Sequence, residues 1–422
     1  MSDRRPDAAH TRSSHGTGEL DRLIVRILFL HPSYPGQFGH VARALAADGN
    51  RCIFVCEEVR EEHDGVQILP YEPIRPARRN GYLTQDFEDA VSRAHVVYEI
   101  LKHQRNELAP DLIVGHANWG SSLFVSELFP DVPVVDYFEY FHQPHGSQID
   151  FRPDFPPAER TVLRHHVQNA SALLRLEACT AGYTPTSHQQ GLLPERYRPK
   201  VRVIHDGIDT SFWRRSFQPG ATPGPRIVTY VSRGLEAIRG FDIFMRVAKR
   251  ICDVHPDVVF MVVGSDEAVY GDDLEHLGGS TLKAHVLRQG DYDLDRIRFL
   301  GWVPRERLVD VLSLSDLHIY LTTPFVLSWS LLNAMACGCT ILASDTDPVR
   351  EVITDGANGL LRGFFDVEGL ADTALEVLED PERYRRLGEA AERTIHERFA
   401  VDVVLPRIRS FYEEIASGSR AR

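Results

Sequence analysis

Short apolar runs alternate with stretches of helical periodicity along the whole sequence, and the pattern occurs twice. In the first half, strands are predicted at 23–30, 51–56, 112–115, 133–137, 181–184 and 201–204, with helices at 37–47 and 87–103. Strands that alternate with helices are typical of parallel sheets, because each crossover helix returns the chain to the same edge. The first half therefore predicts a doubly wound, Rossmann-like domain.

A proline- and glycine-rich stretch at 218–225 interrupts this pattern and predicts an interdomain hinge. The alternation then restarts, with strands at 227–231, 258–263, 297–300, 317–321 and 340–343 and helices at 241–253, 305–314 and 330–336. Residues 367–415 are almost wholly helical in pattern and could pack back across both domains. We expect a disordered tail (1–21), a first domain (22–217), the hinge, a second domain (226–395) and a crossing helix with tail (396–422).

Charge and composition exclude some classes of protein. The formal net charge of −13 argues against a nucleic-acid partner, which would require a concentrated basic face. No apolar run is long enough to cross a bilayer, and residues 1–20 lack the apolar core of a signal peptide. The six cysteines suit reduced thiols, so we expect a cytoplasmic protein.

Two short segments are basic although the net charge of the chain is negative. Arg75, Arg78 and Arg79 form one group, and Arg214 and Arg215 form the other. Each could touch an anionic substrate or a membrane surface, but a solvated loop is the favoured interpretation. Peripheral membrane contact stays open on this basis, and the sequence does not indicate the oligomeric state.

Several loops follow predicted strands, where ligands of open α/β sheets bind near helix N-termini. Gly36 and Gly264 would allow a close backbone approach, or simply form turns. Arg233 and Arg239 could clamp a pyrophosphate, because guanidinium forks bind phosphate in bidentate fashion, or be ordinary surface arginines. Ser328 and Ser330 surround a predicted helix start, where Ser330 could be only an N-cap.

Taken together these loops resemble the retaining, nucleotide-sugar-dependent glycosyltransferases of family 4, which have the GT-B fold. The resemblance covers nearly the whole folded chain and is strongest in the second half. It rests on five segments in order: VIHDGID (203–209), SRGLEAIRGFD (232–242), FLGWVP (299–304) with SD (315–316), NAMACG (333–338), and VRE (349–351) with DGANGL (355–360). The resemblance implies two Rossmann-like domains that face each other across a cleft.

The resemblance also implies roles for individual residues. Arg233 matches the family's phosphate-binding arginine, and Arg239 stands where lysine is usual. His116 lies where many members have a histidine that touches the donor sugar, although a structural histidine is the alternative. Trp329, within residues 322–350 that have the shape of a nucleotide-sugar site, and Glu351, within the VRE segment, are further donor-site candidates.

Two positions depart from the family pattern. Members usually carry two glutamates eight positions apart, of which the first lies near the donor sugar and the second binds the ribose. Here these positions read Phe325 and Asn333. Asn333 can still hydrogen-bond a ribose hydroxyl, whereas Phe325 cannot replace a carboxylate, so sugar recognition is repacked or passes to a group such as Ser328.

No side chain is an obvious nucleophile, and the resemblance implies a front-face reaction in which the protein supplies positioning and electrostatics. The pairs Asp291 with Asp293 and Asp345 with Asp347 have metal-binding spacing, but the fold normally needs no metal and surface turns are the favoured reading. We therefore expect no metal and no cofactor besides the donor substrate.

A loop of the first domain, residues 136–145, is the best candidate for an acceptor site. It gathers aromatic, acidic and imidazole side chains just past a predicted strand end, and such a group could stack on a sugar ring and bind its hydroxyls. A packed surface loop is the alternative. The candidate acceptor residues are Glu139, Tyr140, His142 and His145.

The leading hypothesis is a glycosyltransferase that moves a sugar from a nucleoside-diphosphate sugar to an acceptor hydroxyl with retention. The acceptor class stays open among a polysaccharide, a lipid-linked molecule and a secondary metabolite. Two alternatives remain: a non-catalytic partner subunit that binds nucleotide sugars, favoured by the loss of both glutamates, and a GT-B epimerase acting on the nucleotide sugar itself.

Overall fold

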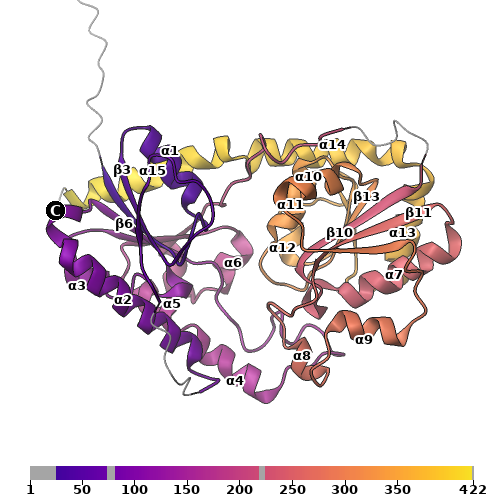
Figure 1. Ribbon diagram of the computed structural model, residues 1–422, viewed down its shortest axis with the longest axis horizontal. Coiled ribbons are helices and arrows are strands. Elements are labelled where there is room, and N and C mark those ends of the chain that lie inside the picture. The colour runs from indigo at the N-terminus through magenta and orange to yellow at the C-terminus, as the bar shows by residue number, and fades with distance from the viewer. Residues whose placement is uncertain (1–24, 74–80, 218–223, 421–422) are drawn as a thin grey trace, which may run out of the picture.

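The computed structural model describes residues 25–73, 81–217 and 224–420, which form two α/β domains side by side (Figure 1). Three expectations lie wholly or largely outside these residues: the tail at 1–21, the basic group at 75–79 and the hinge at 218–225. The second basic group is packed rather than solvated at one position, since Nε of Arg215 donates to the carbonyl of Cys337 at 2.9 Å.

The first domain is built on a seven-stranded sheet of order β5-β3-β1-β6-β7-β8-β9, in which all neighbours are parallel. The predicted strands are all present. β5 was not predicted, because the strand has only four residues and begins with a polar one. The strands are β1 (Arg26–Leu30), β3 (Arg51–Cys56), β5 (Gln67–Pro70), β6 (Leu112–His116), β7 (Val134–Tyr137), β8 (Ala181–Thr184) and β9 (Val201–Val203).

Helices cover both faces of this sheet, and a small two-stranded ribbon, β2 (Ser33–Tyr34) and β4 (Glu58–Val59), lies beside it. The segment between β7 and β8 holds two helices that no sequence pattern indicated. The helical elements are α1 (Gly39–Ala47), α2 (Gln85–Leu108), η1 (Ala117–Trp119), α3 (Val125–Leu128), α4 (Glu159–Gln168), α5 (Ala170–Ala178), α6 (Ser187–Leu192) and η2 (Glu195–Lys200).

The second domain repeats the architecture with a six-stranded parallel sheet of order β12-β11-β10-β13-β14-β15. Its strands are β10 (Arg226–Gly234), β11 (Val258–Ser265), β12 (Ile297–Gly301), β13 (Leu317–Tyr320), β14 (Ile341–Ser344) and β15 (Leu360–Arg362). Its helices up to residue 350 are η3 (Ala237–Arg239), α7 (Phe241–Val254), α8 (Asp273–His276), α9 (Leu282–Gln289), α10 (Arg305–Ser313), α11 (Trp329–Ala336) and α12 (Asp347–Arg350).

The long helical region predicted at 367–415 is confirmed as three helices, α13 (Val367–Glu379), α14 (Pro381–Arg398) and α15 (Val401–Arg420). α15 crosses back to the first domain, along the top of Figure 1, where its Val404, Ile408 and Phe411 join that domain's core. The crossing explains the apolar face of the helix, because that face packs in the core of the first domain.

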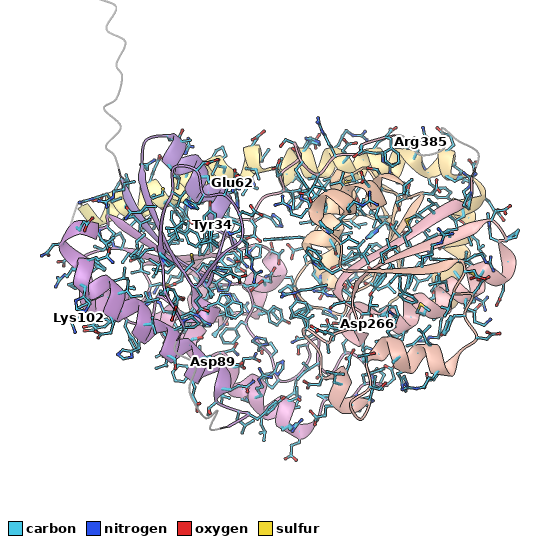
Figure 2. The ribbon with its side chains drawn as sticks, in the orientation of Figure 1. Tyr34, Glu62, Asp89, Lys102, Asp266 and Arg385 are labelled. Atoms are coloured by element: carbon cyan, nitrogen blue, oxygen red, sulfur yellow. The ribbon has the colours of Figure 1, made fainter. Side chains whose placement is uncertain are left out.

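The carboxyl ends of the two sheets face each other. Tyr140 follows β7 and Phe325 follows β13, and their ring centroids lie 4.8 Å apart. In Figure 2, Asp89 of the first domain and Asp266 of the second lie on the facing sides of the two domains. The loops that carry the candidate residues therefore meet between the domains.

Candidate functional site

One aromatic ring contacts both of the arginines predicted to bind phosphate. Arg233 is the last residue but one of β10 and is exposed, whereas Arg239 ends η3 and is buried. Their guanidinium carbons lie 5.9 and 5.7 Å from the ring centroid of Tyr270, within the range of a cation–π contact. One cation is therefore exposed to solvent and the other is buried.

Arg239 holds the loop that leads into α11. Its Nη1 donates to Oγ1 of Thr322 at 2.8 Å and to the carbonyl of Val326 at 3.3 Å. The Phe325 ring covers the same guanidinium at 5.3 Å. Arg239 thus supports the loop in this structure, and its contact with a diphosphate stays a prediction.

The N-terminus of α11 lies at the end of this loop. The helix begins at Trp329, and Ser328 is its N-cap, since its Oγ accepts from the amide of Ser330 at 3.2 Å. The N-cap is therefore Ser328, two residues before Ser330, which the sequence had indicated as a possible N-cap. Asn333 lies one turn further on and is buried.

Trp329 reaches across to the first domain. Its Nε1 donates to Oδ2 of Asp206 at 3.1 Å, and Asp206 follows β9. Burial raises the pKa of Asp206 from its ordinary value of 3.8 to about 7, with Glu139 adding to the rise and hydrogen bonds from Tyr137 and Trp329 opposing it. A buried carboxyl that titrates near neutrality therefore bridges the two domains.

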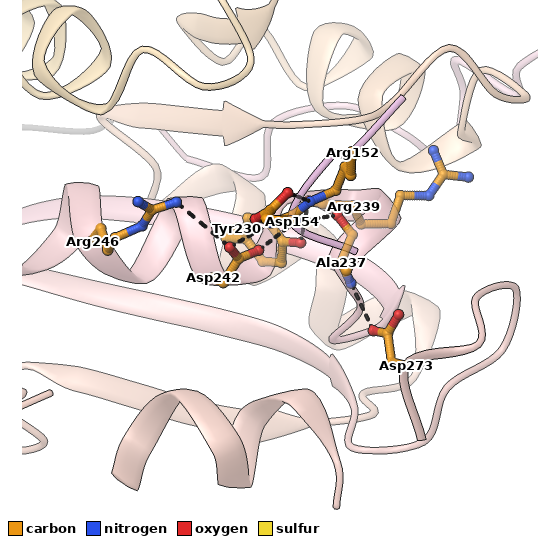
Figure 3. Close-up of polar contacts among 8 residues, drawn as sticks. All are labelled: Arg152, Asp154, Tyr230, Ala237, Arg239, Asp242, Arg246 and Asp273. Atoms are coloured by element: carbon orange, nitrogen blue, oxygen red, sulfur yellow. Dashed lines mark hydrogen bonds and ion pairs between the residues drawn. The ribbon is translucent and has the colours of Figure 1, made fainter. Parts of the chain in front are cut away.

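The turn that carries Arg239 is fixed from the first domain by Arg152 (Figure 3). Arg152 is 2% exposed, and its Nη1 donates to the carbonyl of Ala237 at 2.8 Å and to Oδ1 of Asp242 at 2.7 Å. Its Nη2 donates to the other oxygen of Asp242 at 2.8 Å and to Asp154 at 2.6 Å. The loop after β7 is thereby anchored in the second domain.

His116, predicted to touch the donor sugar, is fully buried at the end of β6. Neither ring nitrogen has a hydrogen-bond partner within the described residues, and Nε2 lies 3.4 Å from Oε2 of Glu139. The ring of His31 packs 5.5 Å away, and burial lowers the pKa of His31 to about 3, with the charge of His116 as the next cause. The sugar-binding role of His116 stays a prediction.

Three of the four candidate acceptor residues line one cavity. Glu139, Tyr140 and His142 border a space of about 260 Å³ that Phe325 and Tyr270 close from the second domain. His145 is not part of it: its side chain is 74% exposed and lies 4.0 Å from Asp150. The expected cluster therefore divides into a cavity wall and a solvent-exposed residue.

The two candidate glycines have structural reasons for their identity. Gly36 has φ +49°, and a side chain there would meet the ring of His31 at 2.5 Å. Gly264 has φ +155°, and a side chain there would lie 2.9 Å from the carbonyl of Ser232. Both glycines are required by packing, and their approach to a ligand stays a prediction.

Glu351 joins the two domains. Its Oε2 accepts from the amide of Ser187 at 2.9 Å, and its Oε1 accepts from the amide of His188. The carboxylate thus caps the start of α6, a favourable position for an anion. A contact between Glu351 and a donor stays a prediction.

The aspartate pairs with metal-binding spacing are engaged by arginines. Asp345 and Asp347 both pair with Arg350, and Asp293 pairs with Arg296. Within the described ranges, no group of three or more His, Cys, Asp and Glu side chains is placed to hold a metal ion. None of the helices in these ranges has the length and apolar character to span a bilayer.

Sequence reasoning missed Tyr270, Arg152 and Asp206. Tyr270 stands in a loop without a motif, and Arg152 contacts residues about ninety positions away, so no local pattern marks either. Asp206 lies inside the segment at 203–209 where the resembling family has asparagine. That substitution was the one available signal that a carboxyl enters the interdomain region.

The titration of Asp206 predicts a pH-dependent stability difference. Because its folded pKa is raised, its stabilising contribution is present below about pH 4 and is lost as the pH rises toward about 7. Asp206→Asn should therefore raise the melting temperature relative to wild type at about pH 8 and leave it nearly unchanged at about pH 4.5. The rise of the Asp206 pKa from 3.8 to about 7 limits the difference in folding free energy to about 4 kcal/mol. An equal difference at both pH values would contradict the assignment.

Two facing parallel-sheet domains, with the candidate residues at the carboxyl ends of both sheets, define the GT-B fold. Solved structures share it: HepE from Anabaena in complex with UDP and glucose aligns over 92% of this chain and 99% of its own, with a TM-score of 0.66 and 18% identity. Sucrose-phosphate synthase from Thermosynechococcus elongatus aligns over 93% and 99%, with a TM-score of 0.69 and 16% identity.

Sequence comparison gives a glycosyl transferase match for each domain. Residues 48–213 match the glycosyl transferase family 4 group, and residues 211–394 match glycosyl transferases group 1. Together the two matches cover most of the chain.

Curated relatives share part of their length with this chain. N-acetyl-α-D-glucosaminyl L-malate synthase from Bacillus anthracis is 26% identical over 221 residues, which cover 51% of this chain and 54% of the synthase. Phosphatidyl-myo-inositol mannosyltransferase from Mycolicibacterium smegmatis is 28% identical over 219 residues, covering 50% and 52%. The chain thus spans about half the length of these relatives.

Proposed function

We propose that this protein is a retaining glycosyltransferase that moves a sugar from a nucleoside-diphosphate sugar to an acceptor hydroxyl and forms an α-glycoside. The observation that carries the proposal is the cavity between the sheets. Donor-side residues Phe325 and Tyr270 and acceptor-side residues Glu139 and Tyr140 border the same space. Two substrates bound from opposite domains would meet there.

The diphosphate would bind between Arg233 and the start of α11. Arg233 is exposed beside Tyr270, and the free amides of a helix N-terminus favour phosphate. Asn333 would hydrogen-bond the ribose, and the loop at Gly264 would border the base. The Anabaena structure with UDP and glucose supports a nucleotide sugar as the ligand class for this fold.

The reaction breaks the bond between the anomeric carbon and the phosphate oxygen and forms a bond to the acceptor oxygen on the same face. The acceptor proton passes to the leaving phosphate oxygen, and Arg233 stabilises the charge that develops on the diphosphate. We infer that no metal ion takes part, since a guanidinium group can supply this charge.

The acceptor would enter along the first domain and place its hydroxyl near Glu139. A polysaccharide, a lipid-linked molecule and a secondary metabolite all carry suitable hydroxyls. The six cysteines are free and buried, which supports a reaction in the cytoplasm.

The test is a product assay with UDP-, GDP-, ADP- and dTDP-sugars and a panel of acceptors, with and without EDTA. We expect NDP release that depends on acceptor, is unaffected by EDTA, and yields a product whose anomeric proton has the small coupling of an α-linkage. An inverted product or loss of activity in EDTA would contradict the proposal. Binding without turnover would instead favour the partner subunit, and donor conversion without acceptor would favour the epimerase.

A further inference from the structure

The cavity between the domains has two chemically different sides. On the first-domain side, Glu139, His142 and Gln168 supply polar groups. Nδ1 of His142 and Oε1 of Gln168 are buried and have no hydrogen-bond partner within the described residues. Burial lowers the pKa of His142 to about 3, with His165 as the next cause, so the ring is neutral and can hydrogen-bond a hydroxyl.

Another part of the lining is apolar. Phe325 and Val326 form it together with the rings of Tyr140 and Tyr270, and Phe325 lies 4.8 Å from Tyr140 and 5.5 Å from Tyr270 between ring centroids. The hydroxyls of the two tyrosines are both engaged. Tyr140 donates to Oε1 of Gln148 at 2.6 Å, and Tyr270 accepts from Nη1 of Arg233 at 3.4 Å.

The proposed position of the diphosphate would place the donor sugar in this cavity. Arg233 packs against Tyr270, and the loop that precedes α11 contains Phe325 and Val326. A sugar attached to the second phosphate would therefore lie beside these residues. The volume of about 260 Å³ is below the usual range for drug-sized ligands, and it suits a single sugar ring.

We propose that the donor is a deoxysugar nucleotide, bound with an edge that lacks a hydroxyl against Phe325, and that Phe325 is the residue that selects it. This inference rests on the proposed function. The remaining hydroxyls of the sugar would face Glu139 and the unpaired polar atoms of His142 and Gln168.

The physical reason is the cost of an unpaired hydroxyl. A hydroxyl turned toward Phe325 would leave water and find no side-chain partner, whereas a methyl or methylene group there buries apolar surface. Recognition sites discriminate by about tenfold or more when a polar group is left unpaired in this way. The sugar that fits best therefore carries fewer hydroxyls than glucose.

The first experiment uses the wild-type chain and separates the nucleotide from the sugar. Calorimetric titration with UDP, GDP, ADP and dTDP identifies the preferred base. A second titration compares, on that base, a hexose, its 6-deoxy form and its 4,6-dideoxy form. We expect at least one deoxy form to bind about tenfold tighter than the hexose. Equal or tighter binding of the hexose would overturn the inference and leave the proposed function standing. No binding of any nucleotide would refute the proposed function.

The second experiment tests Phe325 itself. Phe325→Glu would place a carboxylate within reach of Arg239, whose guanidinium lies 5.3 Å from the present ring, and would offer an acceptor to a sugar hydroxyl. Phe325→Leu keeps the wall apolar and is the matched control. We expect Phe325→Glu to reverse or abolish the preference for the deoxy form and Phe325→Leu to retain it. The same preference in both variants would show that another residue selects the sugar.

Discussion

Replacing Arg152 with alanine is expected to cost about 3 kcal/mol of folding stability, because it leaves the carboxylate of Asp242, which is 14% exposed, with only its exposed partner Arg246. The guanidinium is 2% exposed and pairs with both oxygens of Asp242 and with Asp154. The change also removes the hydrogen bond to the carbonyl of Ala237, in the turn that carries Arg239. Urea unfolding of both proteins measures the difference.

A matched control lies on the same carboxylate. Arg246 pairs with Asp242 at 3.6 Å, but its side chain is 52% exposed. Because exposed pairs contribute about 0–1 kcal/mol, Arg246→Ala should have little effect. Equal destabilisation by Arg152→Ala and Arg246→Ala would contradict the role of Arg152 as the anchor between the domains.

Replacing Arg233 with alanine is expected to lower kcat/KM for sugar transfer by about 100- to 1,000-fold, the usual effect of removing one group that stabilises developing charge. The side chain is exposed, so its loss should not change the fold. Arg233→Lys keeps the charge but loses the bidentate geometry, and it should recover part of the rate. Steady-state kinetics with the preferred donor measures all three proteins.

The control for this prediction is Arg288→Ala. Arg288 is an exposed arginine of the same domain whose Nη2 donates to Oγ of Ser280 at 2.8 Å, on α9 rather than beside Tyr270. It should keep wild-type kinetics. Unchanged kinetics in Arg233→Ala would remove Arg233 from the donor site.

Local sequence patterns predicted most of the fold. Most strands of both sheets are short apolar runs, and the C-terminal helices have a continuous helical period, so these elements could be recognised without tertiary information. β5, β15 and α4 could not. β5 is exposed at both of its ends, β15 is only three residues long, and α4 is polar apart from a few buried positions. Elements of this kind are held by their neighbours rather than by their own pattern.

The candidate site was predictable in its location but not in its internal contacts. Spacing could place Arg233 and Arg239 on one loop, but it could not show that one is exposed and the other buried behind Phe325. The hydrogen bond from Trp329 to Asp206 joins residues that lie more than a hundred positions apart in the sequence. Such contacts depend on how the two domains pack, and no local signal records that packing.

The central claim is that the exposed Arg233 and the N-terminus of α11 form a nucleotide-sugar site. Titration of wild type and Arg233→Ala with UDP-, GDP-, ADP- and dTDP-sugars tests it most directly. We predict that at least one of these donors binds wild type and that Arg233→Ala weakens its affinity by about tenfold or more, as the loss of a charge-assisted phosphate contact requires. Equal affinity in the two proteins, or no binding of any donor to wild type, would contradict the claim.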